Sequence, residues 1–157
     1  MTIFDVLKKD HDEIKDILDK IEKDIRGNSG QCQALFAKLK PMVLAHSRAE
    51  EEVFYSVLEE HDQTEELAEH AEDEHAEAEE MLEQMDEEEA GEASWRMVFD
   101  QLAAALRHHI QQEEGEMFRK AREVLGEQDL QSMGEAFVER KQRVLSGEQE
   151  AQQRRSA

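Results

Sequence analysis

Cysteine, proline and glycine are scarce in this chain, and each scarcity excludes a class of protein. The 157 residues include one Cys, one Pro and seven Gly. Cys32 alone can form neither an internal disulfide nor a multi-thiolate metal site, which excludes zinc ribbons, thioredoxin-like folds and disulfide-stabilised secreted domains. We therefore expect a cytoplasmic protein. No apolar run approaches the ~20 residues of a membrane span, and residues 1–10 lack the order of a signal peptide, so no membrane partner is expected.

Basic residues are also few. The chain has 19 Lys and Arg against 40 Asp and Glu, a formal net charge of −21, which opposes binding to a phosphate backbone and excludes nucleic acid as an expected partner. The acidic excess lies in residues 49–95, which contain many Asp and Glu and no Lys or Arg. Such a block is most often a solvated helix face. A nucleic-acid mimic or a calcium buffer is the alternative, although residues 59–89 lack the Gly and alternating Asp or Asn of an EF-hand loop.

The chain is rich in helix-forming residues, in a length that suits one domain. Abundant Ala, Leu, Glu, Gln and Met, with few Gly and β-branched residues, favour helix nearly everywhere. Apolar residues recur at alternating steps of three and four in four long segments, which is the spacing of one helix face. These segments cover approximately residues 4–25, 31–60, 63–89 and 95–125.

Four long helices with short connections predict an all-α protein, an antiparallel up-and-down four-helix bundle with an additional short C-terminal helix. Apolar residues from Leu130 to Leu145 mark this fifth helix. Pro41 lies inside the second segment, where we expect a kink or a break. Residues 1–147 form the expected domain. Residues 148–157 form a polar C-terminal tail with too little apolar material to fold.

A histidine interrupts the apolar stripe of each of the four long segments, and the second and fourth stripes also carry a glutamate. Glu50 and Glu113 each follow a histidine of the same stripe by four residues, so each pair points the same way. Burying ionised carboxylates beside imidazoles needs compensating positive charge, and no Lys or Arg occupies the stripes. Bound metal is the simplest compensation, and this donor set suits iron, manganese or zinc. The four histidines of the stripes are His11, His46, His75 and His109.

The same pattern is compatible with two alternatives. A single histidine on an apolar stripe is more often a hydrogen-bonded core residue than a ligand, although four of them, two with a Glu one turn away, are hard to explain singly. A ferritin-like di-iron bundle also places Glu and His on four helices, with Glu-x-x-His on two of them. Here only Glu72-Asp-Glu-His75 has that spacing, and the His-x-x-x-Glu pairs run in the opposite order.

The segments around these residues carry a specific pattern, in which His-x-x-x-Glu-Glu recurs and is followed by an apolar-aromatic pair. The segments are Leu7-Lys-Lys-Asp-His11-Asp-Glu-Ile14, His46-Ser-Arg-Ala-Glu-Glu-Glu-Val-Phe-Tyr55, Glu74-His75 with Met81-Leu82, and His109-Ile-Gln-Gln-Glu-Glu-Gly-Glu-Met-Phe118. Over residues 3–145 the chain resembles the hemerythrin-like proteins, in particular the bacterial HHE cation-binding domain. The resemblance implies two iron ions with an oxo or hydroxo bridge, for which zinc or manganese can substitute. The implied metal ligands are His11, His46, Glu50, His75, His109 and Glu113.

The third helix departs from the oxygen-carrying members of this family, which have two histidines one turn apart there. His70 and His75 are five residues apart, or ~140° around a helix, so we expect His70 on the flank. The alternative is that a local bulge lets His70 bind as a seventh ligand. His61 and His108 are also expected to be non-ligands. Four imidazoles, two bridging carboxylates and the bridge leave about two of twelve coordination positions open, which favours a small ligand such as O₂, peroxide or nitric oxide.

The surroundings of the implied centre can be assigned only in part. Each histidine is expected to donate its second ring N–H to an outer acceptor. Tyr55 and Trp95 are the two residues with an aromatic polar group. Either could lie near the pocket, although ordinary packing is the favoured expectation. The candidate outer acceptors are Asp12, Glu51, Glu74 and Glu114.

Three functions are compatible with the sequence. The first is a non-enzymatic di-iron protein that binds or senses O₂, peroxide or nitric oxide, or that handles iron. The second is a weak redox enzyme at the same centre, with catalase-like or ferroxidase activity. The third is an acidic helical interaction module without a functional metal. The sequence assigns no protein partner.

Overall fold

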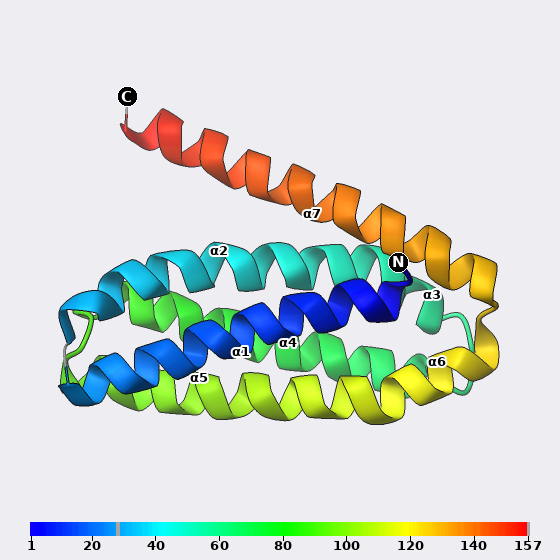
Figure 1. Cartoon of the computed structure of the whole chain (residues 1–157), viewed down its shortest axis with the longest axis horizontal. Coiled ribbons are helices and arrows are strands. Elements are labelled where there is room, and N and C mark those ends of the chain that lie inside the picture. Colours follow the sequence, from blue (N-terminus) through cyan, green and yellow to red (C-terminus); the bar gives the residue numbers. More distant parts are fainter. Residues whose placement is uncertain (28, 157) are drawn as a thin grey trace.

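Four antiparallel helical rods form the body of the protein (Figure 1). The computed structural model describes the chain over residues 1–27 and 29–156, with side chains over residues 1–25 and 30–147. Within the described residues no helix is long and apolar enough to cross a bilayer. The rods are α1 (Ile3–Gly27); α2 (Cys32–Glu50), continued by η2 (Glu51–Tyr55) and α3 (Ser56–Leu58); α4 (Glu65–Glu87); and α5 (Ala93–Gln112), continued by η3 (Glu113–Met117) and α6 (Phe118–Val124). The predicted all-α bundle is confirmed.

Local interactions set the start of the first rod and the turn before the fourth. At the beginning of α1 the backbone N–H of Thr2 donates to Asp5 Oδ2 at 3.0 Å, and the N–H of Asp5 donates to Thr2 Oγ1 at 3.3 Å. This reciprocal pair satisfies backbone donors that have no partner inside the helix. Between α4 and α5 the chain reverses at Gly91, whose φ of 88° is a conformation that residues with a Cβ rarely adopt.

Pro41 does not break the second rod. α2 runs without interruption from Cys32 to Glu50 with Pro41 inside it, so the expected break is not found. A proline in a helix interior costs roughly 3 kcal/mol, because one hydrogen bond is lost and the ring crowds the preceding turn. Leu39 and Val43 on either side of Pro41 are buried in the core, and their packing holds the helix together across it.

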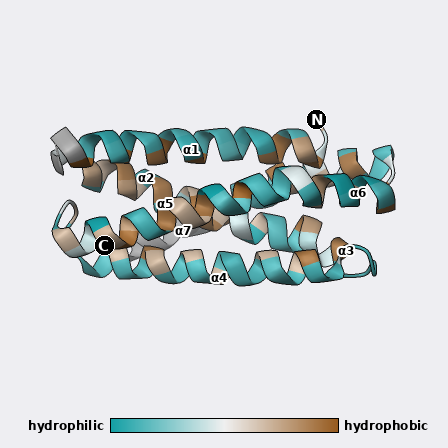
Figure 2. Cartoon of the chain, turned by 90° about the horizontal axis from the view of Figure 1, so that it is seen from below, coloured by the Kyte–Doolittle hydropathy of each residue, from teal (hydrophilic) through white to brown (hydrophobic). Residues whose placement is uncertain are grey.

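The interior consists of two apolar clusters with a polar layer between them. On α1, Leu7 belongs to one cluster and Ile14 to the other, and His11 lies between the two. Figure 2 shows hydrophilic residues on much of the outer surface of α1 and α4. Most acidic side chains of α4 are exposed, as expected for a solvated helix face. The polar layer therefore crosses the middle of the bundle, away from bulk solvent.

The fifth helix is longer than the sequence predicts. α7 (Glu127–Ser156) has 30 residues; its first half packs against α1 and α2, and its last turns diverge from the bundle (Figure 1). The helical backbone thus continues through most of the predicted polar tail, 148–157. The side chains of that segment lie outside the described residues, and the domain boundary at residue 147 stays a prediction.

Gly134 allows α7 to approach the N-terminus closely. A Cβ at Gly134 would collide with the carbonyl oxygen of Met1 and lie 2.8 Å from the backbone carbon of Thr2, whereas nothing lies within 4 Å of a Cβ at Gly147 on the same helix. We expect Gly134→Ala to lower the free energy of unfolding by about 1–3 kcal/mol through overpacking. Gly147→Ala should raise it by about 0.5–1 kcal/mol, because alanine favours helix. Urea unfolding of both variants measures this, and shifts of the same sign would contradict the close approach.

Candidate metal centre

The polar layer brings together all six residues that the family resemblance implies as ligands. Each is less than a tenth exposed. Their donor atoms form two groups, and within each group the atoms lie within 4.8 Å of one another. The first group is His11, His46, Glu50 and Glu113; the second is Glu50, His75 and His109. Because Glu50 belongs to both, the two groups form one continuous centre.

The Nε2 atom of every histidine in the centre faces a glutamate oxygen. Glu50 and Glu113 come from different rods, and each carboxylate lies between two histidines. The distances are 3.3 Å for His11 Nε2 to Glu113 Oε1, 3.6 Å for His46 Nε2 to Glu50 Oε1, 3.1 Å for His75 Nε2 to Glu50 Oε1 and 3.3 Å for His109 Nε2 to Glu113 Oε2.

Several of these inward-facing atoms have no hydrogen-bond partner although they are fully buried. They are His11 Nε2, His46 Nε2, Glu50 Oε2 and Glu113 Oε1. Leaving a buried polar group unpaired costs ~1–3 kcal/mol, so four such atoms close together destabilise the fold considerably unless they have a further partner. Imidazole nitrogens and carboxylate oxygens with free lone pairs are the donors that iron, manganese and zinc accept. The residues present therefore fit a metal site.

The other ring nitrogen of each histidine contacts a carboxylate from a neighbouring rod. These contacts run in a closed ring from α1 to α2 to α4 to α5 and back to α1. Each outer carboxylate is the sequence neighbour of an inner residue, so each rod both supplies a donor and orients a histidine of the next rod. The Nδ1 contacts are His46 with Asp10 at 2.9 Å, His75 with Glu51 at 3.4 Å, His109 with Glu74 at 2.9 Å, and His11 with Glu114 at 2.7 Å.

One predicted outer acceptor is wrong. Asp12 is 78% exposed and pairs with Lys15 on the surface, and Asp10 contacts His46 in its place. Asp10 and Asp12 flank His11 at ~100° on opposite sides of the helix, so which of them faces α2 depends on how α1 is rotated in the bundle. The spacing of residues within the first helix does not determine that rotation.

Tyr55 lies in the middle of the centre, and the expectation that it serves ordinary packing is wrong. Its hydroxyl donates a hydrogen bond to Glu113 Oε2 and lies 2.9 Å from Glu50 Oε1. The same oxygen is 3.3 Å from His109 Nε2 and 3.5 Å from His75 Nε2. The phenol is thus a seventh candidate donor. Trp95, the other residue with an aromatic polar group, packs with Phe36 and Phe99 in an apolar cluster, as expected.

A π-helical turn explains the position of Tyr55. Tyr55 follows Glu50 by five residues, which on an α-helix places the two ~140° apart. In η2 the N–H of Ser56 bonds to the carbonyl of Glu51, five residues earlier, and this wider turn returns Tyr55 to the face of Glu50. The segment η3 repeats the geometry after Glu113, and the equivalent position there is Phe118, which packs in the apolar core.

Without metal, the carboxylates impose protons on two of the four histidines. Burial opposes protonation of His11, but its close contacts with the carboxylates of Glu113 and Glu114 outweigh it and raise the pKa of His11 to about 9. Burial likewise opposes protonation of His109, and hydrogen bonds to Glu113 and Glu74 raise its pKa to about 9. Protons thus supply part of the positive charge that the buried carboxylates require.

The remaining titrations reflect burial and crowding of negative charge. Burial lowers the pKa of His46 to about 4 despite its hydrogen bond to Asp10. Burial and the charge of Glu113 raise the pKa of Glu50, while burial is outweighed at Glu113, where hydrogen bonds to Glu50 and His109 lower the pKa. Burial and both glutamates raise the pKa of Tyr55. A bound cation would reverse this balance by favouring ionised oxygens and neutral imidazoles.

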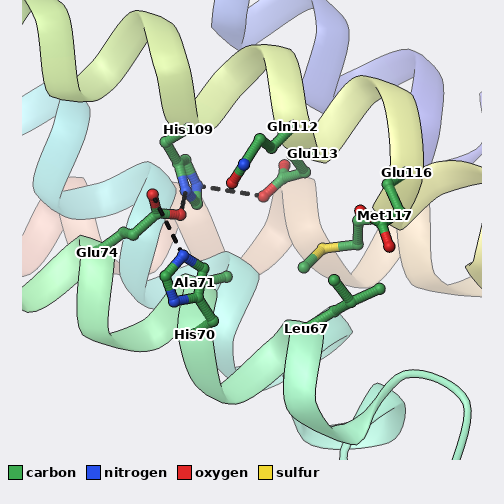
Figure 3. Close-up of a pocket in the computed structure, with 9 residues that line it drawn as sticks. All are labelled: Leu67, His70, Ala71, Glu74, His109, Gln112, Glu113, Glu116 and Met117. Carbon is green, nitrogen blue, oxygen red and sulfur yellow. Dashed lines mark hydrogen bonds and ion pairs between the residues drawn. The ribbon is translucent and has the colours of Figure 1, made fainter.

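A small pocket connects the centre to the surface between α4 and α5 (Figure 3). Its volume is about 110 Å³, which is enough for several water molecules. Leu67, Ala71 and Met117 supply apolar lining, and Glu113 and His109 lie at its inner end. The pocket gives a molecule of a few atoms a direct path to the buried carboxylates.

The three remaining histidines lie outside the two donor groups. His70 is 65% exposed and lies on the pocket rim, 3.7 Å from Glu74 Oε2, so it takes no place beside His75. His108 is exposed and His61 is half-buried in the loop before α4. Glu72 is also outside, so the one ferritin-like spacing is not used in this centre.

The fold and the site together define a class: helical bundles with a buried layer of histidine and glutamate across the middle. The family model of the hemerythrin HHE cation-binding domain matches residues 2–121, and the chain belongs to this family, as the sequence resemblance predicted. A crystal structure of a hemerythrin HHE cation-binding domain-containing protein from Mycobacterium kansasii matches with a TM-score of 0.79 and 24% identity. The match covers 94% of this chain and 89% of that one, and it shows the shared fold. A comparison with curated proteins finds no match.

Proposed function

We propose that this protein binds two iron ions at the centre and uses them to bind O₂ or a related small ligand, such as peroxide or nitric oxide, for sensing, binding or iron handling. The proposed metal ligands are His11, His46, Glu50, His75, His109 and Glu113. Iron, when bound, would supply open coordination positions for the small ligand. Zinc or manganese can occupy the same donors. The cytoplasmic location expected from the single cysteine is part of this proposal.

The observation that carries the proposal is the set of buried, unpaired donor atoms that face one point. His11 Nε2 and Glu113 Oε1 are 3.3 Å apart and neither has a hydrogen-bond partner. An acidic interaction module without metal gives no reason to keep such groups in the core, since apolar residues there would be less costly. The outer carboxylate on every imidazole Nδ1 also leaves the Nε2 lone pair free to bind a cation.

The pocket between α4 and α5 supports a small ligand as the partner. It reaches Glu113 and His109 and holds only a few atoms. Glu74 and Glu116 also line it, and their carboxylates disfavour anions along the path. Small neutral molecules such as O₂, hydrogen peroxide and nitric oxide fit the size of the pocket and are not repelled by its carboxylates.

Tyr55 favours a second candidate function, a redox enzyme with catalase-like or ferroxidase activity. Its phenol lies against Glu50 and Glu113, where it can hold or deliver a proton beside the reacting ligand. A centre that only stores iron does not need a proton donor such as the Tyr55 phenol. A reaction that releases the oxygen atoms of peroxide or O₂ as water does need one.

Metal analysis of the purified protein, combined with absorption spectra, separates these functions. We expect close to two irons per chain and the near-ultraviolet bands of a bridged ferric pair. A reversible spectral change on reduction and exposure to O₂ supports binding or sensing, while steady gas evolution from peroxide supports the enzyme. A chain that folds but takes up no iron, zinc or manganese would leave only the interaction module.

Tyr55→Phe tests whether the phenol contacts the metal. We expect its iron content to stay within about twofold of the wild type, because the other six donors remain and Phe118 shows that phenylalanine fits the equivalent position. Any visible charge-transfer absorption of an iron phenolate in the wild type should be absent from this variant. Trp95→Phe, in the apolar cluster, is the control and should leave the spectrum unchanged. Identical spectra for Tyr55→Phe and the wild type would show that the phenol is not a ligand.

A further inference from the structure

Asp10 differs from the other three outer carboxylates of the centre in its burial. Its side chain is 5% exposed, whereas those of Glu51, Glu74 and Glu114 are 34%, 19% and 26% exposed. Those three can share their charge with water. A carboxylate as buried as Asp10 needs a positive partner from the protein itself.

The fifth helix supplies that partner. Lys141 Nζ of α7 donates to Asp10 Oδ1 at 2.7 Å, and His46 Nδ1 donates to the other oxygen, Oδ2, at 2.9 Å. A chain of charge-assisted hydrogen bonds therefore runs from α7 through α1 to an inner histidine of α2.

A second residue of α7 contacts the same histidine from its ring face. Phe137 is fully buried and meets the His46 ring edge-on, with 5.5 Å between ring centroids and 75° between planes. Phe137 and Lys141 are one turn apart on α7, and the Lys141 Nζ lies 5.9 Å from the centre of the Phe137 ring. α7 thus restrains His46 both at Nδ1 and at its ring.

We propose that α7 is a working part of the metal centre, in which Lys141 is a positioning residue that sets the orientation and basicity of His46 through Asp10. This rests on the proposed function, because His46 acts as a metal ligand in it. Lys141 draws negative charge from Asp10. Without the ammonium group of Lys141, the Asp10 carboxylate accepts a stronger hydrogen bond from the His46 N–H. The imidazole would then be a stronger ligand for ferric iron, and its ring would be less firmly oriented.

Several contacts other than that of Lys141 hold α7 on the bundle. Gly134 packs against the backbone of residues 1–3, and Arg140 donates to Glu52 Oε1 at 3.0 Å. Phe137 belongs to the apolar cluster that contains Phe54 and Phe118. These contacts remain when only the ammonium group of Lys141 is removed.

Lys141→Met tests the proposal, because methionine keeps the stem of the side chain and removes its charge. In the iron-loaded protein we expect release of ferrous iron to a chelator to become roughly 10-fold faster, the size of effect that outer partners of metal ligands typically have. The reduction potential should fall, since the ferric state is favoured. Lys141→Arg should restore both values to near those of the wild type.

Arg143→Met is the matched control. Arg143 lies on the same helix, is 67% exposed and pairs with Glu139, so its removal changes the net charge equally without touching Asp10. We expect iron release within about twofold of the wild type. A second test combines Lys141→Met with Asp10→Asn, where the lysine variant should have little additional effect, because the carboxylate that links Lys141 to His46 is gone.

Unchanged iron release and potential in Lys141→Met would overturn the proposal, and so would equal changes in Lys141→Met and Arg143→Met. A change in thermal stability alone, with both metal properties unchanged, would show that Lys141 only fastens α7. A wild-type chain that takes up no metal would defeat the proposed function itself, which is a different result from either of these.

Discussion

His46→Ala and Glu113→Ala should each abolish metal uptake, reducing iron from close to two per chain to near none. His46 Nε2 and Glu113 Oε1 are among the buried atoms without a partner, so each substitution removes a donor that nothing nearby replaces. Loss of an outer partner weakens metal binding by ~10–100-fold, and loss of a ligand should exceed that. Metal content by elemental analysis after reconstitution measures the effect.

The fold of each variant is checked by circular dichroism before its metal content is compared. This matters most for Glu113→Ala, because contacts with Glu50 and His109 outweigh the cost of burying Glu113 and lower its pKa, and removing one member of a buried charge pair is destabilising. His61→Ala and His70→Ala serve as controls, since both residues lie outside the donor groups and His70 is 65% exposed. Equal iron content in the ligand variants and the controls would defeat the ligand assignment.

Removal of metal should make the stability of the protein strongly dependent on pH between about 6.5 and 9. In the metal-free protein His11 and His109 have pKa values of about 9, above the 6.5 of an unfolded chain. The folded state then binds more protons, and this contribution is fully present below pH 6.5 and lost as the pH rises through 9. Thermal unfolding of the metal-free protein should therefore shift to lower temperature over this range.

The metal-loaded protein should lack this loss, because a bound cation replaces the protons and holds both imidazoles neutral. The stabilisation by metal, taken as the difference between the two unfolding temperatures, should grow from pH 6.5 to 9. The remaining charges of the chain are common to both forms, so the difference isolates the centre. Parallel curves for the two forms would contradict protonation of His11 and His109.

The helices and the inner residues could be predicted because both depend on local periodicity. A histidine such as His75 on a stripe of small apolar residues must face the interior if the segment is a helix. His46 with Glu50, and His109 with Glu113, are single helical turns, so each pair remains on one face wherever the rod lies. The structure brings these residues together, and their role as metal ligands stays a prediction.

Tyr55 shows where periodicity fails. The prediction assumed α-helical geometry through residues 51–55, and a π-helical turn rotates Tyr55 back onto the face of Glu50. A signal was present in the sequence: Tyr55 and Phe118 end the two repeated motifs at the same position, and the only polar group among these paired aromatic residues is the Tyr55 hydroxyl. A polar atom at an otherwise apolar position would have singled it out.

The sequence by itself determined the helical class, the four inward stripes and the family, since these follow from the spacing of residues within single segments. Only the tertiary structure decided which carboxylate orients which histidine, that Asp10 rather than Asp12 meets His46, and that α7 reaches the centre through Lys141. Those contacts join residues on different helices. They depend on how each rod is rotated and how far it is shifted along its neighbours, which local spacing does not specify.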